Sequence, residues 1–188
     1  QQLPTTICSV SEKHDDAKLI QKLFNNSTYF RVYTGHDLIG SELCSSIKNV
    51  YAIASGMLEG LGYGDNARAG LISRALVELR RIVVAMGGKE ETIYGLTGVG
   101  DLVVTTTSHH SRNYQAGVKL ATGKNLEETI ASMAMVVEGA RTAEAIYNAS
   151  KKLNLETPII DAVYRVIYEK EDVNKAVLEL MSRSLKDE

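Results

Sequence analysis

Tryptophan is absent from this chain of 188 residues, and proline, cysteine and phenylalanine occur only twice each. The two cysteines, Cys8 and Cys44, are too few for a disulfide framework and favour a reducing, cytoplasmic location. No apolar run approaches the ~20 residues of a membrane span, and no charged-then-apolar leader opens the chain. The 21 basic and 23 acidic residues nearly balance, so neither a nucleic acid nor a membrane surface is expected as a partner.

The chain does contain enough apolar sequence for a core, since 44% of its residues are hydrophobic. A fold of this size buries roughly 70% of the surface that its unfolded chain exposes, which excludes a disordered protein. Glycine is abundant beside the scarce proline, and eleven of the fifteen glycines fall between Gly40 and Gly100. This clustering predicts a region in which the chain turns tightly or backbones approach closely.

The first forty residues carry the pattern of a parallel α/β unit. Two short β-rich runs, Thr5–Val10 and 29–34, flank a segment at 14–25 whose apolar residues have helical spacing. Two strands alone make a marginal sheet, so this unit is expected to be the end of a larger sheet. Its open strand edge also favours self-association, which makes a homodimer one expected state.

Beyond Gly40 the periodicity is helical throughout. Apolar stripes predict helices around 72–86, 143–153, 160–167 and 173–181, with Pro158 at the start of the third and Asp172 capping the last. Arg74 and Glu78, spaced i,i+4 on the polar face of the first, are predicted to form a solvated pair. The sequence therefore predicts a mainly α protein, with a strand–helix–strand unit at 1–39 and an all-helical domain at 40–188.

Lys48 stands within an otherwise small and apolar helical segment and is the first candidate for chemistry. A lysine in such a segment loses hydration, which favours its neutral form and suits a general base. Asn49 follows it and could orient a ligand. The alternative is a lysine whose ammonium reaches the surface along its aliphatic stem, and this segment alone favours that alternative.

A glycine-rich segment surrounds Asp101. Gly98 and Gly100 allow close backbone approach, but no Lys-Ser/Thr pair follows and the dinucleotide-loop spacing is absent, so a nucleotide loop is rejected. Asp101 could pair with a nearby lysine and tune its proton affinity. Taken by itself, the segment favours the simpler interpretation that Asp101 caps the helix that it precedes.

Ser111, Arg112 and Asn113 open a further helix. Ser111 is a natural N-cap, and the arginine and asparagine add donors to the positive end of the helix dipole, a combination that suits a phosphate. An ordinary capped helix with a solvated Arg112 explains the segment equally well. The adjacent His109 and His110 indicate a surface loop, and no metal site is expected.

Two more helix starts carry charge. Glu138 could contact a ligand hydroxyl, but the simpler interpretation is that it favours the start of its helix through the dipole. Asp65 and Arg68 are typical of a capped helix start with a surface charge.

Together these segments are more specific than each is alone. In order and spacing, four segments of the chain resemble NAD(P)-dependent glycerol-3-phosphate dehydrogenase of the bacterial type. They are 47–50 (IKNV), 100–103 (GDLV), 111–113 (SRN) and 136–139 (VVEG). Supporting pieces are 64–68 (GDNAR) and 158–160 (PII), and the similarity covers nearly the whole chain. The resemblance implies that 40–188 is the all-helical substrate-binding and catalytic domain. It also implies that 1–39 is the end of a Rossmann-type NAD-binding domain.

The resemblance also implies an activity, the interconversion of sn-glycerol 3-phosphate and dihydroxyacetone phosphate by hydride transfer to or from NAD or NADP. Lys48 matches the proton acceptor of the family and Asp101 a carboxylate of the substrate site. Ser111, Arg112 and Asn113 match the positions that hold the substrate phosphate. This agrees with the chemistry that the residues suggest, a desolvated base and an anion-binding helix start.

Cofactor contacts are implied for Arg112, Val136 and Glu138, and the resemblance suggests that Asn49 and Thr105 line the site. The glycine-rich dinucleotide loop of the family is absent from this chain, as is a second lysine of its N-terminal domain. We therefore expect a fragment that is inactive without a Rossmann half. Two alternatives stay open: the helical domain of another hydroxy-acid dehydrogenase, and a non-catalytic helical oligomerisation module.

Overall fold

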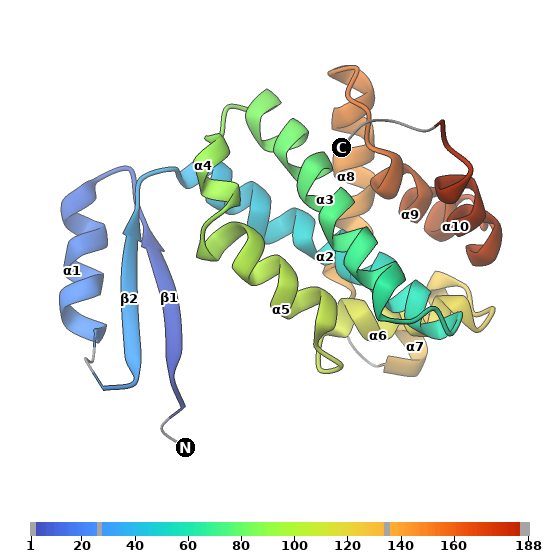
Figure 1. Cartoon of the computed structure of the whole chain (residues 1–188), viewed down its shortest axis with the longest axis horizontal. Helices are drawn as coiled ribbons and strands as arrows, with labels where there is room; N and C mark the ends of the chain where they lie inside the picture. Colours follow the sequence, from blue (N-terminus) through green and yellow to red (C-terminus); the bar gives the residue numbers. More distant parts are fainter. Residues whose placement is uncertain (1–2, 26–27, 134–135, 185–188) are drawn as a thin grey trace.

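The computed structural model describes residues 3–25, 28–133 and 136–184. An α/β unit lies at one end of the molecule and a bundle of helices at the other (Figure 1). The α/β unit consists of β1 (Thr5–Val10), α1 (His14–Phe24) and β2 (Phe30–Gly35). The helical part consists of α2 (Leu38–Gly60), α3 (Asp65–Ala85), α4 (Glu90–Ile93), the π-helical turn η1 (Leu96–Gly100), α5 (Asp101–Thr107), α6 (Arg112–Ala121), α7 (Leu126–Met133), α8 (Glu138–Lys152), α9 (Pro158–Tyr168) and α10 (Val173–Met181). The prediction of a mainly α fold after a strand–helix–strand unit is confirmed.

The two strands form a parallel pair, with Thr5 opposite Phe30 and Val10 opposite Gly35. α1 packs on this pair through Ala17, which is buried, and through Gln21, whose side-chain amide donates to the Val32 carbonyl oxygen at 2.8 Å. The rest of the apolar stripe of α1 has nothing to pack on, because a two-stranded sheet is too narrow to cover it. That stripe stays exposed at Leu19 (54%), Ile20 (38%), Leu23 (66%) and Phe24 (59%).

The junction between the two parts is fixed by one carboxylate. Asp37 caps α2 by accepting from the N–H of Gly40 at 2.9 Å, and it also accepts from the N–H of Lys89 at 2.7 Å and the hydroxyl of Thr92 at 2.5 Å. Burial alone would raise the pKa of Asp37, but these hydrogen bonds outweigh it and hold the pKa below its usual value. The start of α2 is thereby tied to the start of α4.

α2 is the centre of the helical part, and its long apolar segment is buried on all sides. Ile47, Val50, Tyr51 and Ile53 are fully buried, and α3, α5, α6, α8 and α9 all pack against this helix. A helix that is apolar all round is expected in the middle of a bundle rather than at its surface. Lys48 therefore lies on the helix against which α3, α5, α6, α8 and α9 pack.

α2 and α6 cross in backbone contact. A Cβ atom on Gly56 would overlap the Tyr114 carbonyl group, lying 2.8 Å from its carbon, and one on Gly117 would lie 2.8 Å from the Met57 nitrogen. Only glycine allows this approach. The glycine cluster that the sequence shows thus includes one side of a close helix crossing, and Gly117 supplies the other.

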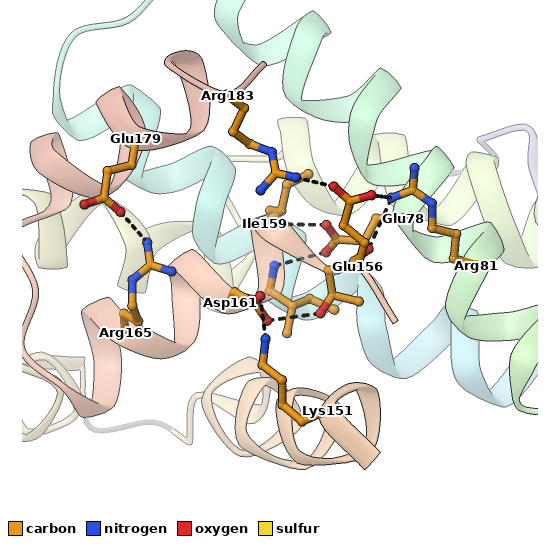
Figure 2. A network of polar contacts seen from close by, with 11 residues as sticks. Glu78, Arg81, Lys151, Glu156, Ile159, Asp161, Arg165, Glu179 and Arg183 are labelled. Atoms are coloured by element: carbon orange, nitrogen blue, oxygen red, sulfur yellow. Dashed lines mark hydrogen bonds and ion pairs between the residues drawn. The ribbon is translucent and has the colours of Figure 1, made fainter. Parts of the chain in front are cut away.

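Glu78 of α3 is buried, with 1% of its surface exposed, so the prediction of a solvated pair with Arg74 is wrong for Glu78. Its carboxylate accepts from the N–H groups of Ile159 at 2.9 Å and Ile160 at 3.0 Å and thus caps α9, as Figure 2 shows. Pro158 begins that helix, as predicted. Burial raises the pKa of Glu78 to about 7, although the two N–H bonds oppose the rise.

The start of α9 is also surrounded by ion pairs (Figure 2). Arg81 and Arg183 both contact Glu156, and Lys151 contacts Asp161 at 2.8 Å.

Within the described ranges, no helix is long and apolar enough to cross a membrane. The same residues contain no group of three His, Cys, Asp or Glu side chains that could hold a metal ion.

Candidate active site

Lys48 forms an ion pair with Asp101, which links the middle of α2 to the first residue of α5. The side chains are 18% and 34% exposed, so the pair is partly shielded from water yet accessible. Gly98 makes this contact reachable, because a Cβ there would lie 2.5 Å from Ile93 Cα and would block the tight turn of η1. The structure thus selects pairing over capping for Asp101, and Gly100 occupies the N-cap position of α5.

Thr105 supports the carboxylate from one turn further along α5. Its hydroxyl donates to the Asp101 carbonyl oxygen at 2.6 Å and lies 3.3 Å from Asp101 Oδ1, the oxygen that does not contact Lys48. Both oxygens of the carboxylate therefore have a partner. Thr105 thus lies beside the Lys48–Asp101 pair, and its place in the lining of an active site stays a prediction.

Ser111 is the N-cap of α6, as predicted, and its hydroxyl oxygen accepts from the N–H of Tyr114 at 3.3 Å. The first N–H groups of an α-helix have no partner within the helix, so the start of α6 presents donors at the positive end of its dipole. Arg112 adds a guanidinium to the same turn. These are the elements of an anion site.

Arg112 lies beside the start of α8, with its Nη2 atom 3.3 Å from Glu138 Oε1. The two side chains are 48% and 59% exposed, and Val136 next to them is also exposed. An exposed ion pair contributes at most about 1 kcal/mol. Separating Arg112 from Glu138 therefore costs little free energy.

Asn113 joins three helices. Its amide nitrogen donates to Asn49 Oδ1 at 2.9 Å, and its amide oxygen accepts from the N–H of Gly139 at 3.0 Å. Asn49 in turn donates to the Ser45 carbonyl oxygen at 3.4 Å. Both polar atoms of the Asn113 side chain are therefore engaged within the protein. Sequence reasoning missed this connection, since nothing local to 49, 113 or 139 indicates that they meet.

The Asn49–Asn113 bond brings the two halves of the candidate site together. Lys48 and Asn49 are neighbours on α2, while Arg112 and Asn113 are neighbours on α6. The candidate residues of α2 and α6 are thus linked directly by a hydrogen bond between these two helices.

Two details of the α3 start were predicted wrongly. Gly64, not Asp65, is its N-cap, and Asp65 is the first helical residue. Arg68 is not a surface charge, because its side chain is only 16% exposed and its Nη2 atom lies 2.5 Å from Glu59 Oε2. Arg68 packs inward because the chain reverses direction between the end of α2 and the start of α3, which places Arg68 beside Glu59.

The sequence profile described as the C-terminus of NAD-dependent glycerol-3-phosphate dehydrogenase matches residues 37–178. The chain belongs to the glycerol-3-phosphate dehydrogenase family. This confirms the resemblance found in the sequence. The match begins where α2 is capped by Asp37 and ends within α10, so it covers the helical part of the molecule.

Curated relatives agree with the family assignment. The chain is 50% identical over 184 residues to glycerol-3-phosphate dehydrogenase [NAD(P)+] of Limosilactobacillus reuteri, covering 98% of this chain and 54% of that protein. A relative with the same description from Geobacillus kaustophilus is also 50% identical, over 185 residues, with the same coverage. The chain thus spans about half the length of the curated relatives that it matches.

Solved structures of the family have the same fold. The glycerol-3-phosphate dehydrogenase of Coxiella burnetii superposes with a TM-score of 0.92 at 39% identity, over 97% of this chain and 56% of that one. The enzyme of Saccharomyces cerevisiae gives a TM-score of 0.85 at 25% identity, again over 97% of this chain and 56% of that one. The family fold therefore extends over the α/β unit as well as the helices.

Proposed function

We propose that this chain is the substrate-binding and catalytic part of an enzyme that interconverts sn-glycerol 3-phosphate and dihydroxyacetone phosphate with NAD or NADP. The observation that carries the proposal is the Lys48–Asp101 ion pair, which lies across one hydrogen-bonded helix crossing from the capped start of α6. A small phosphorylated alcohol needs such a pair of features: a group that moves a proton, and a seat for the phosphate.

Lys48 is the proton-transfer group. In the oxidation direction its amine accepts the proton of the C2 hydroxyl, and in the reduction direction its ammonium returns that proton to the carbonyl oxygen. Asp101, which Thr105 orients, holds the ammonium in place at the edge of the site. Holding the reacting groups in register is itself a large part of the rate enhancement.

Arg112 and the first N–H groups of α6 bind the substrate phosphate, because a guanidinium and a helix N-terminus both favour an anion. Ser111 fixes that turn as its cap, and Asn113 ties it to α2.

The residues at the start of α8 fit a nicotinamide dinucleotide. Glu138, Val136 and Arg112 are all exposed here. Glu138 provides a carboxylate for ribose hydroxyls, Val136 an apolar contact, and Arg112 a cation for a phosphate. When bound, the cofactor accepts or returns the hydride at C2. We assign Arg112, Val136 and Glu138 to its binding.

A dinucleotide-binding half is the partner that this arrangement needs. The unpaired strand edges and the exposed stripe at Leu19, Leu23 and Phe24 are the surface that such a half would cover. We therefore assign 1–39 to the end of a Rossmann-type domain and 40–188 to the substrate domain. For this chain without such a half, we also propose a homodimer that forms through the uncovered sheet edge. The free thiols of Cys8 and Cys44 support a cytoplasmic location, which we propose as well.

Ligand binding to the purified chain tests the phosphate seat. In a titration monitored by backbone-amide NMR, glycerol 3-phosphate is expected to change the chemical shifts of residues 111–113 until they saturate. Glycerol, which lacks the phosphate, is expected to leave these chemical shifts unchanged. Arg112→Met should weaken binding about tenfold, the loss of one charge-assisted contact. Arg165→Met is the matched control, since it removes an ion-paired arginine at Glu171 and Glu179 on α9. Absence of saturable binding by the unmodified chain would refute the proposed phosphate seat.

Activity tests the role of Lys48. In a protein that joins this chain to a dinucleotide-binding half, Lys48→Met should lower kcat by about 10²–10⁴-fold, the usual contribution of a general base. KM for glycerol 3-phosphate should change much less, because the phosphate seat is intact. A variant that keeps its kcat would show that another group moves the proton.

A further inference from the structure

Arg68 is a charged side chain of the helical part that the proposed mechanism does not use. It lies in the first turns of α3, where Glu59 of α2 holds its Nη2 atom at 2.5 Å and Asp65 lies 3.6 Å from its Nη1 atom. Its other neighbour is an aromatic ring: the guanidinium carbon is 6.0 Å from the centre of the Tyr114 ring. A guanidinium at this distance from a ring face is attracted to it.

Tyr114 connects this cation to the candidate site. It is buried, follows Asn113 directly in α6, and its backbone N–H donates to the capping hydroxyl of Ser111. The His109 ring is perpendicular to the tyrosine ring, with the two ring centres 5.3 Å apart. The ring thus has both Arg68 and His109 as neighbours, and its backbone belongs to the turn that would bind phosphate.

Two charged side chains, Arg68 and Glu59, also interact with the Tyr114 phenol. Burial raises the pKa of Tyr114, the Arg68 guanidinium lowers it, and the Glu59 carboxylate raises it. Both partners of the Arg68–Glu59 ion pair therefore lie close enough to interact with the phenol. Because Glu59 fixes Arg68, the guanidinium has a defined place against the ring rather than a range of rotamers.

We propose that Arg68 is a positioning residue for the anion-binding turn at 111–113 and acts through the Tyr114 ring. This inference rests on the proposed function, because it concerns the seat of the substrate phosphate. Arg68 does not itself contact the ligand. It holds Tyr114, and with it the cap at Ser111 and the N–H groups that follow, in the geometry that an anion needs.

Three variants separate this role from a general loss of stability. Arg68→Met removes the cation, Arg68→Lys keeps a charge that can pair with Glu59 and lie over the ring, and Arg165→Met removes an ion-paired arginine on α9. Circular dichroism of each purified chain establishes that it is folded.

The first measurement is amide hydrogen exchange over residues 111–115. Exchange should become several-fold faster in Arg68→Met, return toward the unmodified rate in Arg68→Lys, and stay unchanged in Arg165→Met. Equal exchange in Arg68→Met and in the unmodified chain would overturn the inference. So would an equal acceleration in Arg165→Met, because Arg68 would then act only through overall stability.

The second measurement is the affinity for glycerol 3-phosphate. The dissociation constant should rise about five- to tenfold in Arg68→Met, the effect expected from losing one cation–π contact and its ion pair. It should recover in Arg68→Lys, and an unchanged constant in Arg68→Met would overturn the inference. If the unmodified chain binds no glycerol 3-phosphate, the proposed function fails on that result, and hydrogen exchange still decides whether Arg68 positions the turn.

Discussion

Glu78 provides the sharpest test of the physical reasoning, because a single buried carboxyl group should control how stability depends on pH. Its carboxylate caps α9 through two backbone N–H bonds, yet only 1% of its surface is exposed. Burial disfavours the charged form, while the N–H bonds favour it. The pKa of about 7, against 4.5 for a free glutamate, means that burial wins.

The sign and size of the effect follow from proton linkage. Below pH 4.5 Glu78 is protonated in both the folded and the unfolded chain, and between pH 4.5 and about 7 only the folded chain keeps the proton. The free energy of unfolding therefore falls as the pH rises through this window and levels off above pH 7. At 1.36 kcal/mol for each pH unit of full difference, the contribution of Glu78 to the free energy of unfolding falls by about 2–3 kcal/mol between pH 5 and pH 8.

Glu78→Gln isolates this contribution, since glutamine has the same shape and does not titrate. Urea unfolding of both chains at half-unit steps from pH 5 to pH 8 gives the difference in their free energies of unfolding. Relative to the variant, the unmodified chain should lose about 2–3 kcal/mol of unfolding free energy between pH 5 and pH 8. Glu90→Gln, at a half-exposed glutamate of α4, is the control for the loss of a carboxylate. A difference between Glu78→Gln and the unmodified chain that does not change with pH would refute the reasoning, because the N–H bonds would then fully offset burial.

Two further predictions concern backbone packing and the junction. Gly56→Ala should lower the free energy of unfolding by about 2 kcal/mol or more, because its Cβ overlaps Tyr114. In contrast, Gly70→Ala should raise the free energy of unfolding by about 0.5–1 kcal/mol, because Gly70 of α3 has open space around it. Urea unfolding of the two variants measures these changes. Equal effects of the two substitutions would contradict the packing argument. Asp37→Ala should destabilise the chain above the low pKa of Asp37, because three donors lose their acceptor, and the loss should vanish in acid. An unchanged urea midpoint at pH 7 would contradict this.

Local signals in the sequence predict the elements well. Thr5–Val10 is a strand as expected, Asp172 caps α10 by accepting from the N–H of Lys175 at 2.9 Å, and Pro158 begins α9. Each of these depends on residues within a few positions of one another. The burial of Glu78 does not, because it is decided by the N-terminus of α9, some eighty residues later in the chain. The spacing to Arg74 could indicate only a polar helix face.

The candidate site divides in the same way. The cap at Ser111 is local and was predictable, whereas the choice for Asp101 between capping α5 and pairing with Lys48 depends on how closely η1 turns. The bond between Asn49 and Asn113 is invisible in the sequence, since it needs the α2–α6 crossing to exist first. The order and spacing of the four segments carry more information than any one of them, which is why the family resemblance held.

The glycine contact between α2 and α6 has a consequence for the precision of the site. Exposed side chains change rotamer within picoseconds to nanoseconds, but two backbones in contact separate only when a whole helix moves. Lys48 lies on one of these helices and Arg112 begins the other, so Gly56 and Gly117 set the span between them without any intervening side chain. The spacing of Lys48 and Arg112 thus depends on two residues that lie outside the proposed site.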